Sequence, residues 1–150
     1  MNKIILAFFS ILFIYSCSYE PIFLNKNINF NFKEINFEGN SEVNNIIKNN
    51  LLNRANGDVE YSIFFKSDKK KIIISSDAKG DPSIYKIEIN LVYETKKDRN
   101  LIFKNNLKKQ VTYNNIDDKF ELSKYEENII TTIANNLSEE IILSIISIDK

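Results

Sequence analysis

The side chains that most often carry out catalysis are scarce in this chain, which has 150 residues, no His and one Cys. Without His, no Ser-His-Asp or Cys-His arrangement can form, and no Cys/His zinc site can form either. The acidic pairs at 117–118, 126–127 and 139–140 are adjacent in sequence. Neighbours on a helix diverge by about 100°, so they cannot share a site as paired catalytic carboxylates do. We therefore expect no enzyme, no metal and no cofactor.

Basic side chains cluster at 69–71, 96–99 and 108–109. In a chain with 20 basic and 20 acidic residues such clusters are commonly solvated turns, and the zero net charge argues against a nucleic-acid partner. The alternative is contact with an anionic group. Lys96, Lys97 and Arg99 are the strongest candidates because they lie at a predicted hairpin tip, where lysines can engage phosphates electrostatically.

Cys17 is placed to receive a lipid. It follows an apolar stretch at 4–14, which is about half the length needed to span a bilayer and fits the core of a secretory signal. With Ile14 three positions before the cysteine and Ser16 directly before it, the segment resembles a bacterial lipoprotein signal. We predict a signal peptide at 1–16, and at 17–30 an extended tether that starts with a lipidated Cys17 bearing palmitate-type chains. A free cysteine in a transmembrane segment is the alternative.

Residues 31–150 show the patterns of one domain. Alternation of apolar and polar residues predicts a strand at 33–38, with one slip of phase at 32–35. An amphipathic helix of about 13 residues follows. Its cap is expected at 40–41, and Asn-Gly at 56–57 is a plausible stop because glycine can take the left-handed conformation.

Three further strands are predicted. The segment 59–76 alternates but is interrupted at 67–70, so it forms either one long broken strand, which we favour, or a tight hairpin. Two clearly alternating runs then surround a charged loop at 96–100. Each arm of the hairpin around this loop is expected to be more than about 30 Å long.

A helix of roughly 25 residues ends the pattern, starting at a capping box at 123–126. The order is strand, helix, strand, strand, strand, helix. Two helices most simply cover one face of a mainly antiparallel four-stranded sheet, which gives a two-layer α+β sandwich. The face of the sheet that the helices do not cover would be polar and exposed to solvent.

In order and spacing, these features resemble the lipopolysaccharide-assembly lipoprotein family LptE in its alphaproteobacterial form. The run at 17–23 is similar to the family's Cys-Gly-aromatic-x-Pro-Leu-Tyr opening, with Ser18 in place of Gly. A Leu pair at 51–52 ends the first helix, and Thr-Tyr-Asn at 112–114 resembles the family's Ser-Tyr-Asn run. The family often has a basic residue at the start of the first long hairpin strand, and Lys79 is the nearest base here.

The resemblance implies an outer-membrane, lipid-anchored protein on the periplasmic side, with the β-barrel LptD and lipopolysaccharide as partners. It would plug the barrel and assist insertion of lipopolysaccharide into the outer leaflet. Candidate lipopolysaccharide contacts are Lys79, Lys96, Lys97 and Arg99. A wide polar surface and a long, narrow domain suit a polar barrel lumen. The alternative is a periplasmic lipid-anchored binding lipoprotein of similar α+β fold with a different ligand.

Overall fold

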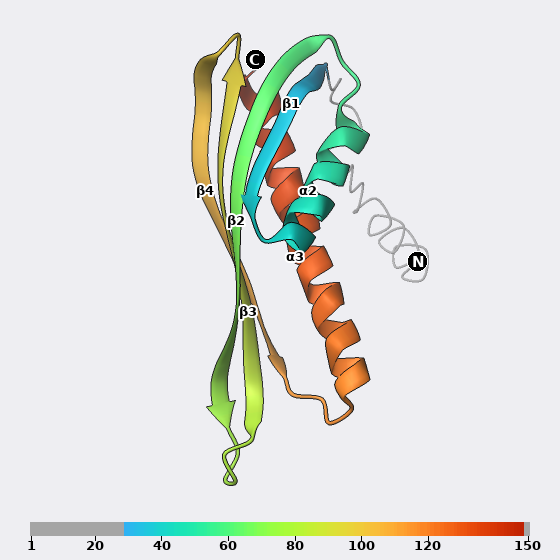
Figure 1. Cartoon of the computed structure of the whole chain (residues 1–150), viewed down its shortest axis with the longest axis vertical. Coiled ribbons are helices and arrows are strands. Elements are labelled where there is room, and N and C mark those ends of the chain that lie inside the picture. The colour runs from blue at the N-terminus through green and yellow to red at the C-terminus, as the bar shows by residue number, and fades with distance from the viewer. Residues whose placement is uncertain (1–28, 149–150) are drawn as a thin grey trace, which may run out of the picture.

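The computed structural model describes residues 29–148, which form one four-stranded sheet and two helices (Figure 1). The elements are β1 (Phe30–Gly39), α2 (Ser41–Arg54), β2 (Val59–Ser76), β3 (Pro82–Lys97), β4 (Asn100–Asn114) and α3 (Lys119–Ile148). This order confirms the predicted α+β class. The predicted signal peptide, Cys17 and most of the tether lie outside the described residues.

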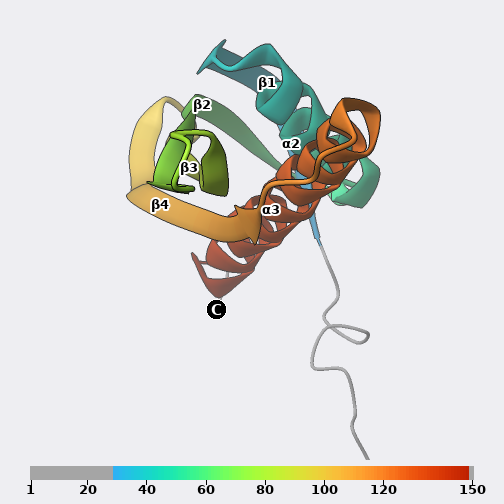
Figure 2. The same ribbon diagram turned by 90° about the horizontal axis from the view of Figure 1, so that it is seen from below.

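The strands lie in the order β1-β2-β3-β4, and both helices cover the same face of the sheet, as Figures 1 and 2 show together. Antiparallel pairing joins β2 to β3 and β3 to β4, whereas β1 pairs with β2 in parallel. A parallel pair needs a crossover connection, which α2 supplies between β1 and β2. The predicted sandwich is therefore confirmed, with one parallel pair at its β1 edge.

β1 contains a β-bulge at the position where the sequence alternation slips. Phe32 pairs with Tyr61 and Glu34 with Ser62, so Lys33 is the extra residue. The extra residue keeps the apolar side chains before and after it on the helix-covered face. The strand is longer than the predicted 33–38, since it begins at Phe30, whose ring is buried.

α2 begins as its cap predicts, because Asn40 Oδ1 accepts a hydrogen bond from the Val43 N–H at 3.1 Å. Its end differs from the prediction, since the helix stops at Arg54 and Gly57 does not have a positive φ. The Gly57 N–H donates instead to the Phe30 carbonyl at 2.9 Å, and a Cβ at this position would overlap the main chain of Asn29 and Phe30, where β1 begins. Close approach of two chain segments therefore explains this glycine.

β2 is a single strand of 18 residues, as preferred for 59–76. The predicted interruption at 67–70 is wrong, because these residues pair with β3 without a break. Ser67 is tolerated inside the strand because it is buried against α2, where its Oγ donates to Asn44 Oδ1 at 2.7 Å. The irregularity falls at 73–76 instead.

β3 and β4 form the expected long hairpin, with arms of 16 and 15 residues. At about 3.3 Å per residue, β3 spans roughly 50 Å. The loop at its tip is smaller than the predicted 96–100, because only Asp98 and Arg99 lie between the strands, with φ values of 50° and 69°. Two consecutive positive φ values are typical of a tight two-residue hairpin turn.

α3 begins at Lys119, so the predicted capping box at 123–126 lies inside the helix and does not start it. Asp118 is the cap, since its Oδ1 accepts from the N–H groups of Phe120 and Glu121 at 2.8 and 3.1 Å. By length and composition this 30-residue helix could cross a membrane, but half of its most apolar window is buried inside the domain. The packing identifies α3 as the main core helix.

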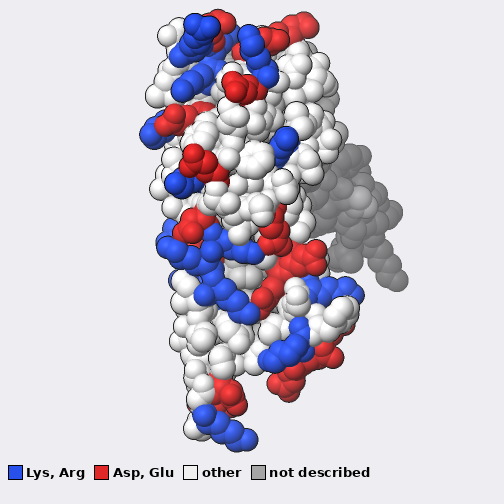
Figure 3. All heavy atoms as spheres, in the orientation of Figure 1, with Lys and Arg blue, Asp and Glu red and all other residues white. Residues whose placement is uncertain are grey.

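The core lies between the helices and the sheet. Alternate residues of β2 and β3 fill it from the sheet side: Tyr61, Ile63, Phe65, Ile87, Ile89, Leu91 and Tyr93. The opposite, open face of these strands carries mainly charged and amide side chains, as predicted, including Lys66, Asp68, Lys70, Lys86, Glu88 and Asn90. Figure 3 shows basic and acidic side chains interspersed over the visible surface, with no large area of one sign.

Candidate anion-contact site at the tip of the long hairpin

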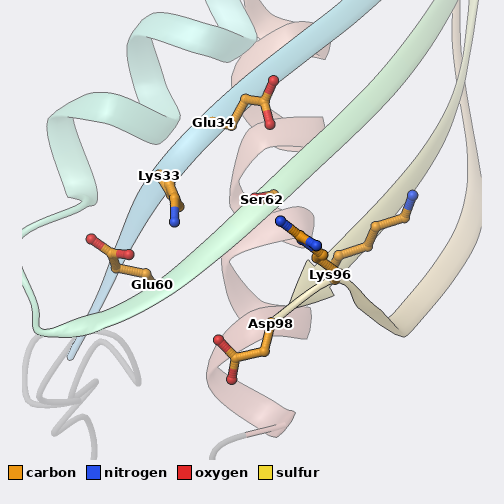
Figure 4. A pocket seen from close by; sticks show the side chains of 7 residues that line it. Lys33, Glu34, Glu60, Ser62, Lys96 and Asp98 are labelled. Atoms are coloured by element: carbon orange, nitrogen blue, oxygen red, sulfur yellow. The ribbon is translucent and has the colours of Figure 1, made fainter.

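A hollow of about 500 Å³ lies beside the β3–β4 turn (Figure 4). Its lining comes from three strands and the turn: Lys33, Glu34, Glu60, Ser62, Lys96, Asp98 and Arg99. We name this hollow the tip hollow. It contains two of the four basic residues predicted to contact lipopolysaccharide, Lys96 and Arg99.

Strand pairing brings these distant segments together. Glu34 pairs with Ser62 across the parallel β1–β2 ladder, and Ser62 pairs with Lys96 across the antiparallel β2–β3 ladder. The three residues therefore lie side by side across the sheet. The sequence does not reveal this grouping, because nothing in residues 33–34 or 60–62 shows that they face the hairpin tip.

The tip hollow carries balanced charge, and the purely basic cluster inferred from the sequence is incomplete. Lys33, Lys96 and Arg99 line it together with three acids, namely Glu34, Glu60 and Asp98. Within residues 29–148 none of these six side chains forms an ion pair shorter than 4.0 Å. The bases are therefore available to an anionic group, while the nearby acids limit how much negative charge the site accepts.

Lys97 does not join this site. Successive strand residues point to opposite faces of a sheet, so Lys97 lies on the face opposite to Lys96. Its Nζ stands 5.5 Å from the centre of the buried Tyr61 ring. Such a contact is commonly worth about 0.5–1 kcal/mol, which gives Lys97 a packing role at the rim of the core.

Lys79 lies at the other end of the molecule, in the turn between β2 and β3 (Figure 1). The length of β3 separates it from Lys96 by roughly 50 Å. Its N–H donates to Asp77 Oδ1 at 2.9 Å as part of that turn. One anionic headgroup can thus meet Lys96 and Arg99 but cannot also reach Lys79.

A second cluster of polar and aromatic side chains lies where the first third of α3 meets the sheet. Glu126 Oε1 accepts from Lys71 Nζ at 2.6 Å and from the Tyr113 hydroxyl at 2.7 Å. Lys71 Nζ also stands 4.3 Å from the centre of the Tyr85 ring. Burial, reinforced by the hydrogen bond to Glu126, raises the pKa of Tyr113 well above its usual range. The cluster ties α3 to β2 and β4, a role that the adjacent acids at 126–127 did not reveal.

Charged pairs also run along β3 and β4 on the open face. Lys108 Nζ lies 3.0 Å from Glu88 Oε2, and Lys104 Nζ lies 2.7 Å from Glu94 Oε1. The hydrogen bond from Lys108 lowers the pKa of Glu88, and the one from Lys104 lowers the pKa of Glu94. The basic residues at 104 and 108 thus have acidic partners of their own, with Glu88 shared between Lys108 and Lys86, and they do not line the tip hollow.

Comparison with known proteins finds a shared fold. No family model and no curated protein sequence matches this chain. Among solved structures, the rare lipoprotein B of Shewanella oneidensis is similar with a TM-score of 0.57 at 11% identity, over 77% of this chain and 96% of that one. A lipoprotein of Caulobacter crescentus gives 0.54 at 11% identity, over 75% and 88% of the two chains.

A minor lipoprotein of Acinetobacter baumannii is similar as well, with a TM-score of 0.53 at 11% identity, over 79% of this chain and 93% of that one. The described domain therefore has a fold that several bacterial lipoproteins share. The likeness concerns the backbone and assigns no role to a residue. The lipidation predicted for Cys17 lies outside the described residues and stays a prediction.

Proposed function

We propose that this chain is a lipid-anchored lipoprotein of the outer membrane that acts as the LptE-type plug and assembly subunit of an LptD β-barrel. In this role it assists the insertion of lipopolysaccharide into the outer leaflet and catalyses no reaction. The observation that carries the proposal is the fold, which matches lipoproteins over 75–79% of the chain. Cys17, directly after the predicted signal peptide at 1–16, supports lipid anchoring independently.

The shape and surface of the domain support a position inside a barrel. The β3–β4 hairpin makes it long and narrow, and the open sheet face carries Lys–Glu ion pairs. Barrel lumens are polar, so a plug needs a broad surface that is polar without a strong net charge. Without the predicted signal peptide at 1–16, which contains Lys3, the chain has 19 basic and 20 acidic residues and meets that requirement.

Contact with lipopolysaccharide is proposed at the tip hollow, through Lys96 and Arg99 with Lys33 beside them. Phosphate groups interact with such bases electrostatically, and the acids Glu34, Glu60 and Asp98 in the lining limit how strongly the site attracts an anion. We expect Lys96→Ser combined with Arg99→Ser to weaken binding to lipopolysaccharide micelles. Lys97→Ser is a matched control, since its side chain lies on the other face against Tyr61.

The partner is tested by purification from membranes in detergent, using a tag placed after Lys150. A large β-barrel protein is expected to co-purify, and depletion of the chain is expected to reduce lipopolysaccharide at the cell surface. Recovery of the chain alone, together with normal surface lipopolysaccharide after depletion, would refute the proposal. That result would instead support a binding lipoprotein of the same fold with another ligand.

A further inference from the structure

The tip hollow is lined by equal numbers of acidic and basic side chains, and this balance restricts the kind of ligand that suits it. The acids are Glu34, Glu60 and Asp98, and the bases are Lys33, Lys96 and Arg99. A simple anion is attracted by the bases but repelled by the acids, and the reverse holds for a simple cation. A ligand of one sign therefore gains from only half of the charged groups.

The pairing of three strands holds an acid and a base apart in this hollow. Ser62 lies between Glu34 and Lys96 in one row across the sheet. Neighbouring strands lie about 4.8 Å apart, so the Cα atoms of Glu34 and Lys96 are roughly 10 Å apart, with only a short side chain between them. The Asn36 side chain donates to Glu34 Oε1 at 2.8 Å, which orients this carboxylate on the β1 side. The row thus offers two separate centres of opposite charge.

Two further acids lie on the tip side of this row. Glu60 is two residues before Ser62 on β2, and Asp98 is two residues after Lys96, in the turn. Figure 4 shows Lys33 directed toward Glu60, while Lys96 extends away from both. The flexible stem of a lysine lets Lys96 turn toward a ligand. Carboxylates accept hydrogen bonds from an ammonium group, whereas lysine and arginine donate to phosphate oxygens.

We propose that the tip hollow binds a zwitterionic headgroup, in which a phosphate diester and a primary ammonium are joined by a two-carbon link, as in phosphoethanolamine. The acids would hold the ammonium, and Lys96 with Arg99 would hold the phosphate. The headgroup has no net charge, like the six charged groups that line the hollow. This inference rests on the proposed function of the site, since both place a headgroup there, but it does not require the barrel.

The first test titrates soluble headgroups into the full-length protein in detergent and follows the amide signals of Ser62 and Lys96 by nuclear magnetic resonance. Glycerophosphoethanolamine should bind about threefold or more tightly than glycerophosphoglycerol or ethanolamine, which each have one of its two charges, since exposed ion pairs contribute modestly. Glycerophosphocholine should also bind more weakly, because its quaternary ammonium has no N–H to donate. Equal binding of all four compounds, or tightest binding of the anion, would overturn the proposal.

The second test removes two of the acids. Glu60→Gln combined with Asp98→Asn keeps the shapes of the side chains, and asparagine tolerates the φ of 50° at position 98. Affinity for glycerophosphoethanolamine should fall about threefold, because its ammonium loses two partners, while affinity for glycerophosphoglycerol should rise. Asp117→Asn combined with Glu121→Gln is the matched control, since it removes two exposed acids outside the tip hollow and should change neither affinity. A rise in both affinities for the first variant would show that the acids only repel anions, which would refute the proposal.

The third test identifies the source of the headgroup with the same amide signals. The protein is anchored in phosphatidylcholine nanodiscs with or without phosphatidylethanolamine, and it is mixed separately with lipopolysaccharide micelles with or without phosphoethanolamine substituents. A response to the substituent in the nanodiscs assigns the site to phospholipid, and a response in the micelles assigns it to lipopolysaccharide. No response in either would contradict the zwitterion site, and co-purification of a barrel in that case would leave the proposed function standing.

Discussion

The buried contact between Ser67 and Asn44 yields the sharpest stability prediction. Ser67 Oγ donates to Asn44 Oδ1 at 2.7 Å, and Asn44 Nδ2 donates to the Glu38 carbonyl at 2.9 Å. Both side chains are buried, at 2% and 1% exposure. Ser67→Ala removes the donor and leaves the Asn44 oxygen buried without it. Such an orphaned acceptor costs about 1–3 kcal/mol of unfolding free energy.

The prediction is checked by urea and thermal unfolding of the full-length protein, followed by circular dichroism. For a domain of this size, the expected loss corresponds to a melting temperature lower by roughly 4–12 °C. Ser76→Ala is the matched control, because Ser76 lies exposed at the end of the same strand and should change stability by less than about 0.5 kcal/mol. Equal melting temperatures for the two variants would show that the Ser67–Asn44 contact does not anchor α2 to β2.

Three further outcomes follow from local geometry. In urea unfolding, Gly39→Ala should lower the free energy of unfolding more than Gly80→Ala does. Both glycines have a positive φ, so both substitutions strain the backbone. A Cβ at Gly39 would in addition overlap the Ser67 carbonyl of β2, whereas a Cβ at Gly80 would meet no other atom. Tyr113 has a raised pKa in the folded chain, so its contribution to stability is complete below the usual tyrosine pKa of about 10 and declines as pH rises above it. Tyr113→Phe should therefore lose less stability than the wild type between neutral and strongly alkaline pH, which pH-dependent unfolding measures, and an unchanged slope would count against the buried hydroxyl. Lys96→Ser with Arg99→Ser should weaken binding to lipopolysaccharide micelles most at low salt, because exposed charges are screened at high salt; a salt-independent loss would contradict electrostatic contact.

Much of the fold follows from local sequence patterns, and the exceptions have identifiable causes. The slip of phase at 32–35 falls at the β1 bulge, which lets the alternation resume on the helix-covered face, although the sequence pattern predicted only a strand at 33–38 there. The polar run at 67–70 wrongly predicted an interruption of β2. Ser67 can be buried inside the strand because its hydroxyl donates a hydrogen bond to Asn44, on a helix that precedes β2 in the sequence. The start of α3 was misplaced because Ser123 matched a capping pattern, whereas Asp118 has the actual cap geometry.

The candidate site was less accessible to sequence reasoning. Adjacent positions suggested that Lys96 and Lys97 act together, although strand alternation directs them to opposite faces. Two of the three acids of the tip hollow, Glu34 and Glu60, are brought there by the parallel register between β1 and β2. Sequence patterns predict strands but rarely which strands pair in parallel, so this part of the site required the structure.

The central proposal is that a barrel encloses the domain, and photo-cross-linking from two opposite faces in living cells tests it most directly. One probe replaces Lys70, which is exposed on the open face of β2, and the other replaces Asn136, which is exposed on α3. A barrel that surrounds the domain should be captured by both probes, and the same β-barrel protein should appear in both products. Capture of a barrel by only one of the two probes, or by neither, would contradict the proposal that a barrel encloses the domain.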